Sequence, residues 1–322
     1  MDSPRVRWSS FELYPTSRWR GRVYRALLRA WLMFGGGRFT HRVSRKPDDD
    51  WPLRDLLLPD MPSLSTAAVY TGHPSPDQKI TIQLMDASGK ILGYAKYADK
   101  PRPRSLIANE ASMLGAIPDG VGPRLVRFAP FLQGDLLVQT RLPGRTRTPR
   151  SPQHYKAQTR FLERLVKPGE AYPISEHPFV KSLHVRAGAR RGSLERVVTA
   201  LGDSEWPVAF MHGDLSPANM HWWRGEYLAF DWEYGEQTGL AYFEAPHPLI
   251  EFASLIRGTD PQRAKRAISN CLATYLLPPP YGRSASEVAT LAALSMLISW
   301  YPPRQPDAYE RWLTAFVEAT GY

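Results

Sequence analysis

Two short apolar runs, each followed at once by polar side chains, constrain the fold of this chain more than any other sequence feature. The first run, Val208–Met211, leads into His212-Gly213-Asp214 and, five positions after the aspartate, to Asn219. The second run, Tyr227–Phe230, leads directly into Asp231. Apolar runs of this length bounded by turn-forming residues are typical of buried strands. Two adjacent loops are therefore expected to present two carboxylates and one amide together.

These three side chains, Asp214, Asn219 and Asp231, match what phosphoryl transfer from a nucleotide requires. One carboxylate must orient the hydroxyl that accepts the phosphoryl group, and oxygen ligands must hold Mg²⁺ against the phosphates. Magnesium prefers hard oxygen ligands and keeps several of its waters, so one carboxylate and one amide carbonyl are sufficient. The residue types thus indicate chemistry that depends on magnesium and a nucleotide.

The two loops together resemble the protein-kinase-like superfamily, and within it the aminoglycoside/choline phosphotransferase branch. That branch carries His-Gly-Asp with an asparagine five positions on, then Asp-Trp or Asp-Phe after the next hairpin. The resemblance implies that Asp214 is the catalytic base and that Asn219 and Asp231 are metal ligands. It also implies that His212 is a structural part of the loop. Mg²⁺ is the implied cofactor, with ATP or GTP as co-substrate.

The N-terminal half carries further residues that fit the same resemblance. Lys96 lies in a predicted third strand, where the branch places a lysine that contacts phosphates. Glu110 lies in the helix that follows, which would present it to Lys96 as an ion pair. Gln139 and Arg141 lie in the segment 139–142, which resembles the hinge whose backbone meets the adenine. We therefore expect all four residues to take part in nucleotide binding.

The sequence departs from the pattern of the branch in two places. No Gly-x-Gly-x-x-Gly motif precedes Lys96, and only Tyr70–Ser75 occupies the position of the phosphate loop. Beyond Glu233 the chain lacks the Gly-Asp-Pro segment of many relatives. Glu233 and Glu236 lie close to Asp231 in sequence, which makes them candidates to bind a polyol or a cationic acceptor. Recognition of the acceptor is therefore less transferable than catalysis.

The order of expected elements predicts an α+β protein with a two-lobed, protein-kinase-like fold. The small N-lobe, residues 62–142, should be mixed, with an antiparallel sheet and one helix packed on it. The expected helix is Ser105–Ile117, and the expected strands are Ala67–Tyr70, Ile80–Met85, Ile91–Tyr97, Arg124–Phe128 and Asp135–Thr140. The C-lobe, residues 143–322, should be mainly helical. Asp260-Pro261 is predicted to open one of its helices, and Asp307–Thr320 reads as the last one. Residues 1–61 are expected to be a basic extension that ends in a linker.

The positive charge is concentrated in that extension. The chain has 41 Lys and Arg against 31 Asp and Glu, and residues 1–46 contain 11 of the basic residues but only two acids, Asp2 and Glu12. Residues 18–34 predict a helix with an apolar stripe that includes Trp19 and Trp31 and with arginines on another face. Contact with an anionic membrane surface and packing on the chain's own fold both fit this pattern. Nucleic-acid binding is not expected, because no recognised module is present.

Composition points to a cytoplasmic protein, with peripheral attachment at the inner face of a membrane as an addition. The chain has one cysteine, Cys271, which excludes an internal disulfide and fits a reducing compartment. The first residues lack the order of a signal peptide, and no long uncharged apolar run predicts a spanning helix. We expect the acceptor to be a hydroxyl of a sugar or glycan intermediate. The alternatives are an aminoglycoside or amino-alcohol kinase and a catalytically silent kinase-like binding protein.

Overall fold

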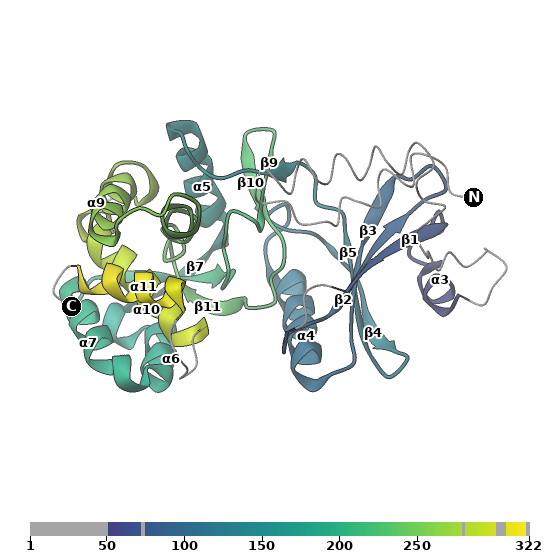
Figure 1. Ribbon diagram of the computed structural model, residues 1–322, viewed down its shortest axis with the longest axis horizontal. Coiled ribbons are helices and arrows are strands. Elements are labelled where there is room, and N and C mark those ends of the chain that lie inside the picture. The colour runs from purple at the N-terminus through teal and green to yellow at the C-terminus, as the bar shows by residue number, and fades with distance from the viewer. Residues whose placement is uncertain (1–50, 72–74, 279–280, 301–306, 320–322) are drawn as a thin grey trace. The chain divides into compact units, whose positions relative to one another are not determined.

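The protein separates into two compact units, each of which is described by itself. The computed structural model describes residues 51–71, 75–278, 281–300 and 307–319 (Figure 1). The first unit runs to Gly115 and resumes over Pro123–Leu142, whereas the second contains Ala116–Gly122 and everything from Pro143 onward. The expected helix over 18–34 lies outside the described residues, and so do residues 72–74 of the segment Tyr70–Ser75.

The first unit is a five-stranded antiparallel sheet with helices against it (Figure 1). Its elements are α3 (Pro52–Leu57), β1 (Thr66–Tyr70), β2 (Ile80–Met85), β3 (Ile91–Ala98), α4 (Pro101–Ala116), β4 (Leu125–Phe131) and β5 (Gly134–Thr140). The strand order is β1-β2-β3-β5-β4, so β3 lies in the middle, paired with β2 and β5. The expected strands and helix are therefore all present, with ends that differ by a few residues.

Successive side chains of β3 point to opposite faces of the sheet, one of which is covered by an apolar core. Ala95 belongs to an apolar core that includes Ile82 and Val138, and Leu57 of α3 packs into the same core. Because neighbouring side chains of a strand point to opposite faces, Lys96 points away from that core. Residues 52–57, which the sequence assigned to a linker, instead form a helix. The prediction missed it because so short an apolar segment has no helical periodicity, and its stability comes from burial in the core.

The second unit combines helices with two small sheets. Its strands are β6 (Arg145–Thr146), β7 (Val166–Pro173), β8 (Glu205–Met211), β9 (Met220–Trp223), β10 (Glu226–Ala229) and β11 (Glu236–Leu240). Its helices are α5 (Pro152–Leu165), α6 (Pro178–Arg186), α7 (Arg191–Leu201), α8 (His247–Glu251), α9 (Pro261–Cys271), α10 (Ala285–Trp300) and α11 (Ala308–Glu318), and a π-helical segment, Phe252–Ile256, follows α8. The strands form two antiparallel sheets, β10-β9-β6 and β11-β8-β7. The two apolar runs around the polar loops are thus β8 and β10, each in a different sheet.

The α+β class predicted from the sequence is confirmed, with a sheet-based first unit and a mainly helical second unit. Asp260 caps α9 as expected, because its carboxylate accepts the Arg263 N–H at 2.9 Å. Asp307 caps α11 in the same way through the Glu310 N–H at 2.8 Å. Among the described helices, none has the length and apolar character needed to cross a bilayer.

Candidate active site

The first polar loop begins with a turn that only glycine can make. Gly213 follows the end of β8 with φ of +81°, in the left-handed region that favours glycine. A Cβ at this position would overlap the carbonyl group of Tyr234, which belongs to the second loop. The close approach of the two loops therefore depends on glycine between His212 and Asp214.

His212 connects the two loops from a fully buried position. Its Nδ1 accepts the Asp214 backbone N–H at 3.3 Å, so its Nε2 carries the proton and donates to the Phe230 carbonyl oxygen at 2.8 Å. Its ring also packs against Trp232, with centroids 4.7 Å apart. These contacts agree with the structural role, rather than a role as a base, that the resemblance implied for His212.

Asp214 and Asn219 are joined directly. The Asn219 side-chain Nδ2 donates to the Asp214 backbone oxygen and to its carboxylate Oδ2, both at 3.0 Å. In the described part of the chain, no hydrogen bond occupies the remaining amide oxygen of Asn219. The Phe230 N–H donates to the Asn219 backbone oxygen at 3.1 Å, which ties this loop to the start of the second one. The loop thus fixes one carboxylate and leaves one amide oxygen for a ligand.

The pKa of the Asp214 carboxyl lies well above its ordinary value. Burial is the main cause, and the negative charges of Glu251 and Asp231 add to it, while the hydrogen bond from Asn219 opposes it. Since charges act strongly only at short range, Asp231 lies near Asp214. The two carboxylates are thus close enough for their charges to interact, and the backbone hydrogen bond from Phe230 to Asn219 joins their two loops.

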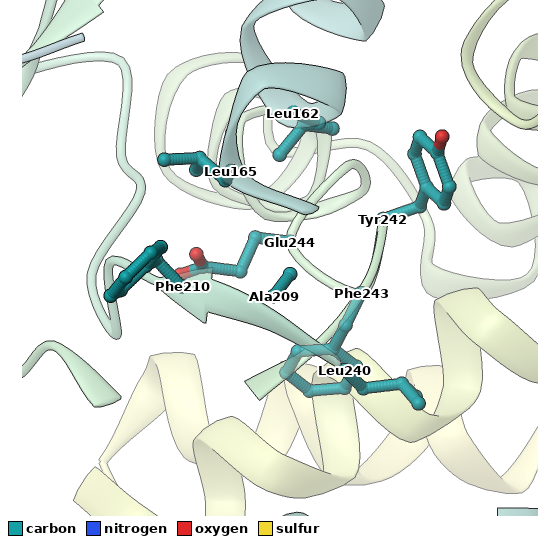
Figure 2. A pocket seen from close by; sticks show the side chains of 8 residues that line it. All are labelled: Leu162, Leu165, Ala209, Phe210, Leu240, Tyr242, Phe243 and Glu244. Atoms are coloured by element: carbon teal, nitrogen blue, oxygen red, sulfur yellow. The ribbon is translucent and has the colours of Figure 1, made fainter. Parts of the chain in front are cut away.

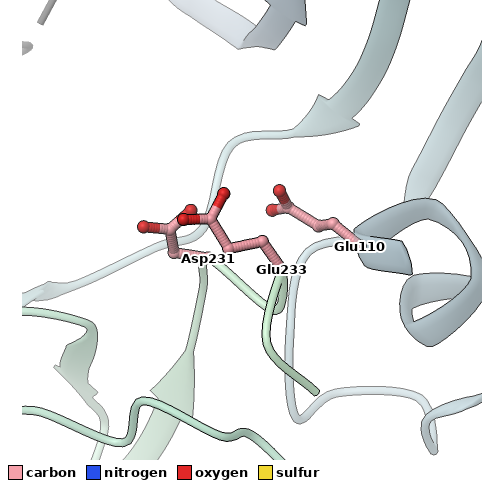
Figure 3. Close-up of side chains that lie close together, drawn as sticks. All are labelled: Glu110, Asp231 and Glu233. Atoms are coloured by element: carbon pink, nitrogen blue, oxygen red, sulfur yellow. The ribbon is translucent and has the colours of Figure 1, made fainter. Parts of the chain in front are cut away.

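Asp231 is held by buried neighbours in an unusual backbone conformation. Its φ is +70°, which an L-residue adopts at a cost of about 1–2 kcal/mol, least for Asp and Asn. The next residue, Trp232, is fully buried, and its Nε1 donates to the Ala229 carbonyl oxygen at 3.0 Å. Glu233 is also buried, and a carboxylate oxygen of Glu233 lies within 4.8 Å of one of Asp231 (Figure 3). Backbone strain at such a position is typical of a site where a side chain must point in one direction.

Glu244, which the sequence analysis did not assign, binds the backbone of the first loop. Its two carboxylate oxygens accept the backbone N–H groups of His212 at 2.5 Å and of Gly213 at 2.8 Å. Figure 2 shows this side chain at a small pocket whose other walls are almost entirely apolar, including Phe210 and Leu162. Burial raises the pKa of Glu244 to about 8, against the lowering effect of the N–H donors. An acid inside the apolar stretch 240–245 was the available signal, since a buried carboxylate needs donors.

Glu251, at the end of α8, is the second acidic residue that the sequence did not single out. It is half-buried, and burial raises its pKa to about 7. No described residue forms a hydrogen bond or ion pair with its carboxylate. Because its charge raises the pKa of Asp214, Glu251 lies close enough to that aspartate for the two carboxylates to interact.

The first unit contains the residues expected to bind a nucleotide. Lys96 of β3 is buried, and its Nζ lies 2.7 and 2.5 Å from the two carboxylate oxygens of Glu110 on α4. Figure 3 shows Glu110 on α4. Gln139 is buried on β5, two residues after Leu137, which pairs with Lys96 across the sheet. The Arg141 backbone N–H donates weakly to the Leu92 oxygen at 3.4 Å. The expected ion pair therefore forms, and the segment 139–142 begins within β5 and extends two residues beyond its end.

Several solved structures are similar to this chain. The chain is similar to a Plasmodium vivax ethanolamine kinase with 11% identity and a TM-score of 0.50, and the similarity covers 100% of this chain and 95% of that one. It is also similar to a thermostable aminoglycoside phosphotransferase mutant in complex with ADP and hygromycin B, with 10% identity, a TM-score of 0.49 and coverage of 84% and 99%. A putative fructosamine-3-kinase from Haemophilus somnus is similar with 11% identity and a TM-score of 0.47, and the similarity covers 84% of this chain and 96% of that one. No protein-family model matches the sequence, and neither does any curated protein.

The likeness to the ethanolamine kinase establishes the fold. The chain has a protein-kinase-like fold, with an antiparallel-sheet unit followed by a mainly helical unit. The resemblance drawn from the two loops is thus confirmed at the level of the fold. What the chain does with that fold has to be argued from its own residues.

Proposed function

We propose that this protein is a magnesium-dependent phosphotransferase that moves the γ-phosphoryl group of ATP or GTP to a hydroxyl of a small molecule. The observation that carries this proposal is the loop in which Asn219 holds the Asp214 carboxylate at 3.0 Å and keeps its own amide oxygen available. A buried Lys96–Glu110 pair in the sheet unit is the second element that such a reaction needs.

The oxygen donors of the two loops suit magnesium. The Asn219 amide oxygen and the Asp231 carboxylate are hard oxygen ligands on loops joined by a backbone hydrogen bond. A magnesium ion held by two such groups would keep several of its waters. Asn219 and Asp231 would hold the ion, which when bound neutralises charge on the phosphates. Glu233 is a third oxygen donor beside Asp231.

In the proposed reaction, Asp214 orients the acceptor hydroxyl in line with the γ-phosphorus. The hydroxyl oxygen forms a bond to that phosphorus, the bond to the bridging oxygen of the leaving diphosphate breaks, and the hydroxyl proton passes to Asp214. A raised pKa makes a carboxylate a stronger base, which favours this transfer. Lys96 contacts the nucleotide phosphates, Glu110 positions Lys96, and the segment with Gln139 and Arg141 meets the base.

We propose a sugar or glycan intermediate as the acceptor and the cytoplasm as the compartment, where nucleoside triphosphates are available. A half-buried Glu251 without a described partner favours a second candidate, an acceptor that carries an ammonium group. A polyol would hydrogen-bond the same carboxylate. A screen of phosphoryl transfer across sugars, aminoglycosides and amino alcohols separates the two candidates.

The test is nucleotide consumption with Mg²⁺ across that acceptor panel, using the intact chain, Asp214→Asn and a control. We expect Asp214→Asn to reduce turnover at least a hundredfold, because general base catalysis contributes about 10²–10⁴-fold. Asp203→Asn, at an exposed position in the turn after α7, is the matched control and should leave turnover unchanged. Equal turnover of both variants and the intact chain would remove Asp214 from the mechanism. No consumption with any acceptor would favour the silent binding protein.

A further inference from the structure

Arg164 of α5 joins two parts of the second unit that are far apart in sequence. Its Nη1 donates to the Gly120 carbonyl oxygen at 3.1 Å, and its Nη2 donates to the Tyr227 carbonyl oxygen at 3.0 Å. Gly120 lies in the connection Ala116–Gly122, which belongs to the second unit, and Tyr227 lies in β10, against which α5 packs (Figure 1). One planar guanidinium group therefore fixes the position of the connection relative to the strand.

The backbone groups bound by Arg164 and by the connection lie along one edge of β10. The other edge of this strand pairs with β9. Tyr227 and Ala229 are two positions apart, so their backbone groups point to the same edge. The Tyr227 oxygen accepts from Arg164, and the Ala229 N–H donates to the Val121 oxygen at 2.9 Å. Because buried backbone groups need partners, the guanidinium and the connection together take the place of a neighbouring strand.

The same connection confines the indole of Trp232. A Cβ on Gly122 would lie 2.9 Å from the indole Nε1, so the connection passes directly over this ring. The indole Nε1 donates to the Ala229 oxygen at 3.0 Å, and the side chain is fully buried. Trp232 directly follows Asp231, whose φ is +70°. A fixed indole therefore holds the backbone of Asp231 in a strained conformation that it would otherwise leave.

The surroundings of Arg164 are unfavourable for a residue that serves stability alone. Its guanidinium is half-buried, and burial lowers its pKa. Among the described residues, no carboxylate forms an ion pair with it, and its buried Nε has no hydrogen-bond partner. A desolvated charge without an acidic partner costs stability that an apolar side chain of similar length would not cost. The guanidinium is therefore explained by the two carbonyl groups that it binds at once.

We infer that Arg164 is a positioning residue for Asp231 and acts through the connection Ala116–Gly122 and Trp232. The inference rests on the proposed function, in which Asp231 holds magnesium. Without the guanidinium, the connection can move away from β10, the indole is released, and Asp231 relaxes to a negative φ. Metal binding must then restore the left-handed conformation. The energy of that conformation in an L-residue corresponds to a loss of metal affinity of about five- to tenfold.

The first experiment follows the Trp232 indole N–H by nitrogen–proton correlation NMR of the intact chain without nucleotide or metal, with Trp232→Phe to identify its resonance. In Arg164→Met we expect this N–H to exchange with solvent about tenfold faster, because the connection no longer covers the ring. Arg160→Met is the matched control, one turn earlier on α5. The partners of Arg160, Gly225 and Glu226, lie at the β9–β10 hairpin instead of the connection, so the exchange rate should not change.

The second experiment measures binding of Mn²⁺, used in place of Mg²⁺, by electron paramagnetic resonance with a non-hydrolysable ATP or GTP analogue. We expect Arg164→Met to bind Mn²⁺ about five- to tenfold more weakly, and Arg160→Met to bind it as the intact chain does. Arg164→Lys keeps the charge but lacks the planar fork that binds two carbonyl groups at once, so its affinity should lie close to that of Arg164→Met. It also answers the question if Arg164→Met does not fold.

Two results would overturn the inference. One is an unchanged exchange rate of the Trp232 indole N–H in both Arg164 variants. The other is a Mn²⁺ affinity of these variants equal to that of Arg160→Met, which a merely structural role predicts together with a lower urea midpoint of unfolding. An intact chain that binds no Mn²⁺ with either analogue would contradict the proposed function instead, and the exchange rates would still decide whether Arg164 holds Trp232 in place.

Discussion

Replacing Gly213 with alanine tests whether the close approach of the two loops positions Asp214, the proposed catalytic base. The new Cβ would lie 2.6 Å from the carbonyl carbon of Tyr234 and 2.8 Å from its Cβ, in addition to adopting φ of +81°. The backbone conformation costs an L-residue about 1–2 kcal/mol. Overpacking costs about 1–3 kcal/mol more. We therefore expect the free energy of unfolding to fall by about 2–5 kcal/mol.

Gly202 offers a matched control for this substitution. It ends α7 with φ of +75°, and a Cβ there would meet no atom within 4 Å. Its ψ of −165° places it in a region that essentially only glycine adopts, so Gly202→Ala should cost only the conformational part, about 1–3 kcal/mol. The difference between the two variants isolates the overlap with Tyr234.

Urea unfolding of both variants measures these free energies, and magnesium-dependent turnover measures the effect on the site. Because the loops must move apart in Gly213→Ala, Asp214 shifts, and a displacement near 1 Å can reduce turnover about a hundredfold. Gly202→Ala should keep its turnover. If Gly213→Ala were no less stable than Gly202→Ala and kept full turnover, the argument that this glycine sets the distance between the loops would be refuted.

Three further variants test the buried ionisable groups. Glu244→Gln should lower the free energy of unfolding by about 1–3 kcal/mol and turnover with it, because one of the two N–H groups it accepts loses its acceptor; unchanged urea midpoints would contradict this. Glu251→Gln removes a negative charge that raises the pKa of Asp214, so the acidic limb of the pH–turnover profile should move to lower pH, while exposed Glu195→Gln should leave it in place. Burial lowers the pKa of His177 to about 4, so the folded protein favours the neutral imidazole. The contribution of His177 to the free energy of unfolding is therefore complete above about pH 6.5 and is lost as the pH falls toward 4. His177→Asn, which keeps a side chain able to cap α6, should remove about 3 kcal/mol of that pH dependence in urea unfolding, and an unchanged dependence would show that another group is responsible.

The sequence predicted well the features that depend on local pattern. β2 has the predicted bounds, Ile80–Met85, and the strand before His212-Gly213-Asp214 is present as β8. Strand periodicity, a tight turn and the order of polar residues are all encoded within a few neighbouring positions. For the same reason the contact between Asp214 and Asn219 could be anticipated, because both side chains belong to one loop.

Features that depend on distant contacts were missed. Glu244 accepts N–H groups that lie 31 and 32 positions before it, a pairing that no local pattern contains. β7 includes Pro168 and Gly169, which argue against a strand, and its pairing with β8 is irregular between Val166 and Ala171. In both cases tertiary packing decided the structure.

The short connection Ala116–Gly122 affects how the protein could be divided. It precedes β4 in the chain, yet it belongs to the second unit, where the Ala229 N–H donates to the Val121 oxygen at 2.9 Å. Gly122 leaves no room for a side chain, because a Cβ there would lie 2.9 Å from Trp232 Nε1. A fragment that starts at Pro143 would therefore lose this covering strip, leaving the indole that precedes Glu233 open to water. The second unit is thus complete only with residues 116–122, which lie in the chain between two segments of the first unit. A split or circularly permuted protein therefore has to keep residues 116–122 together with the chain from Pro143 onward.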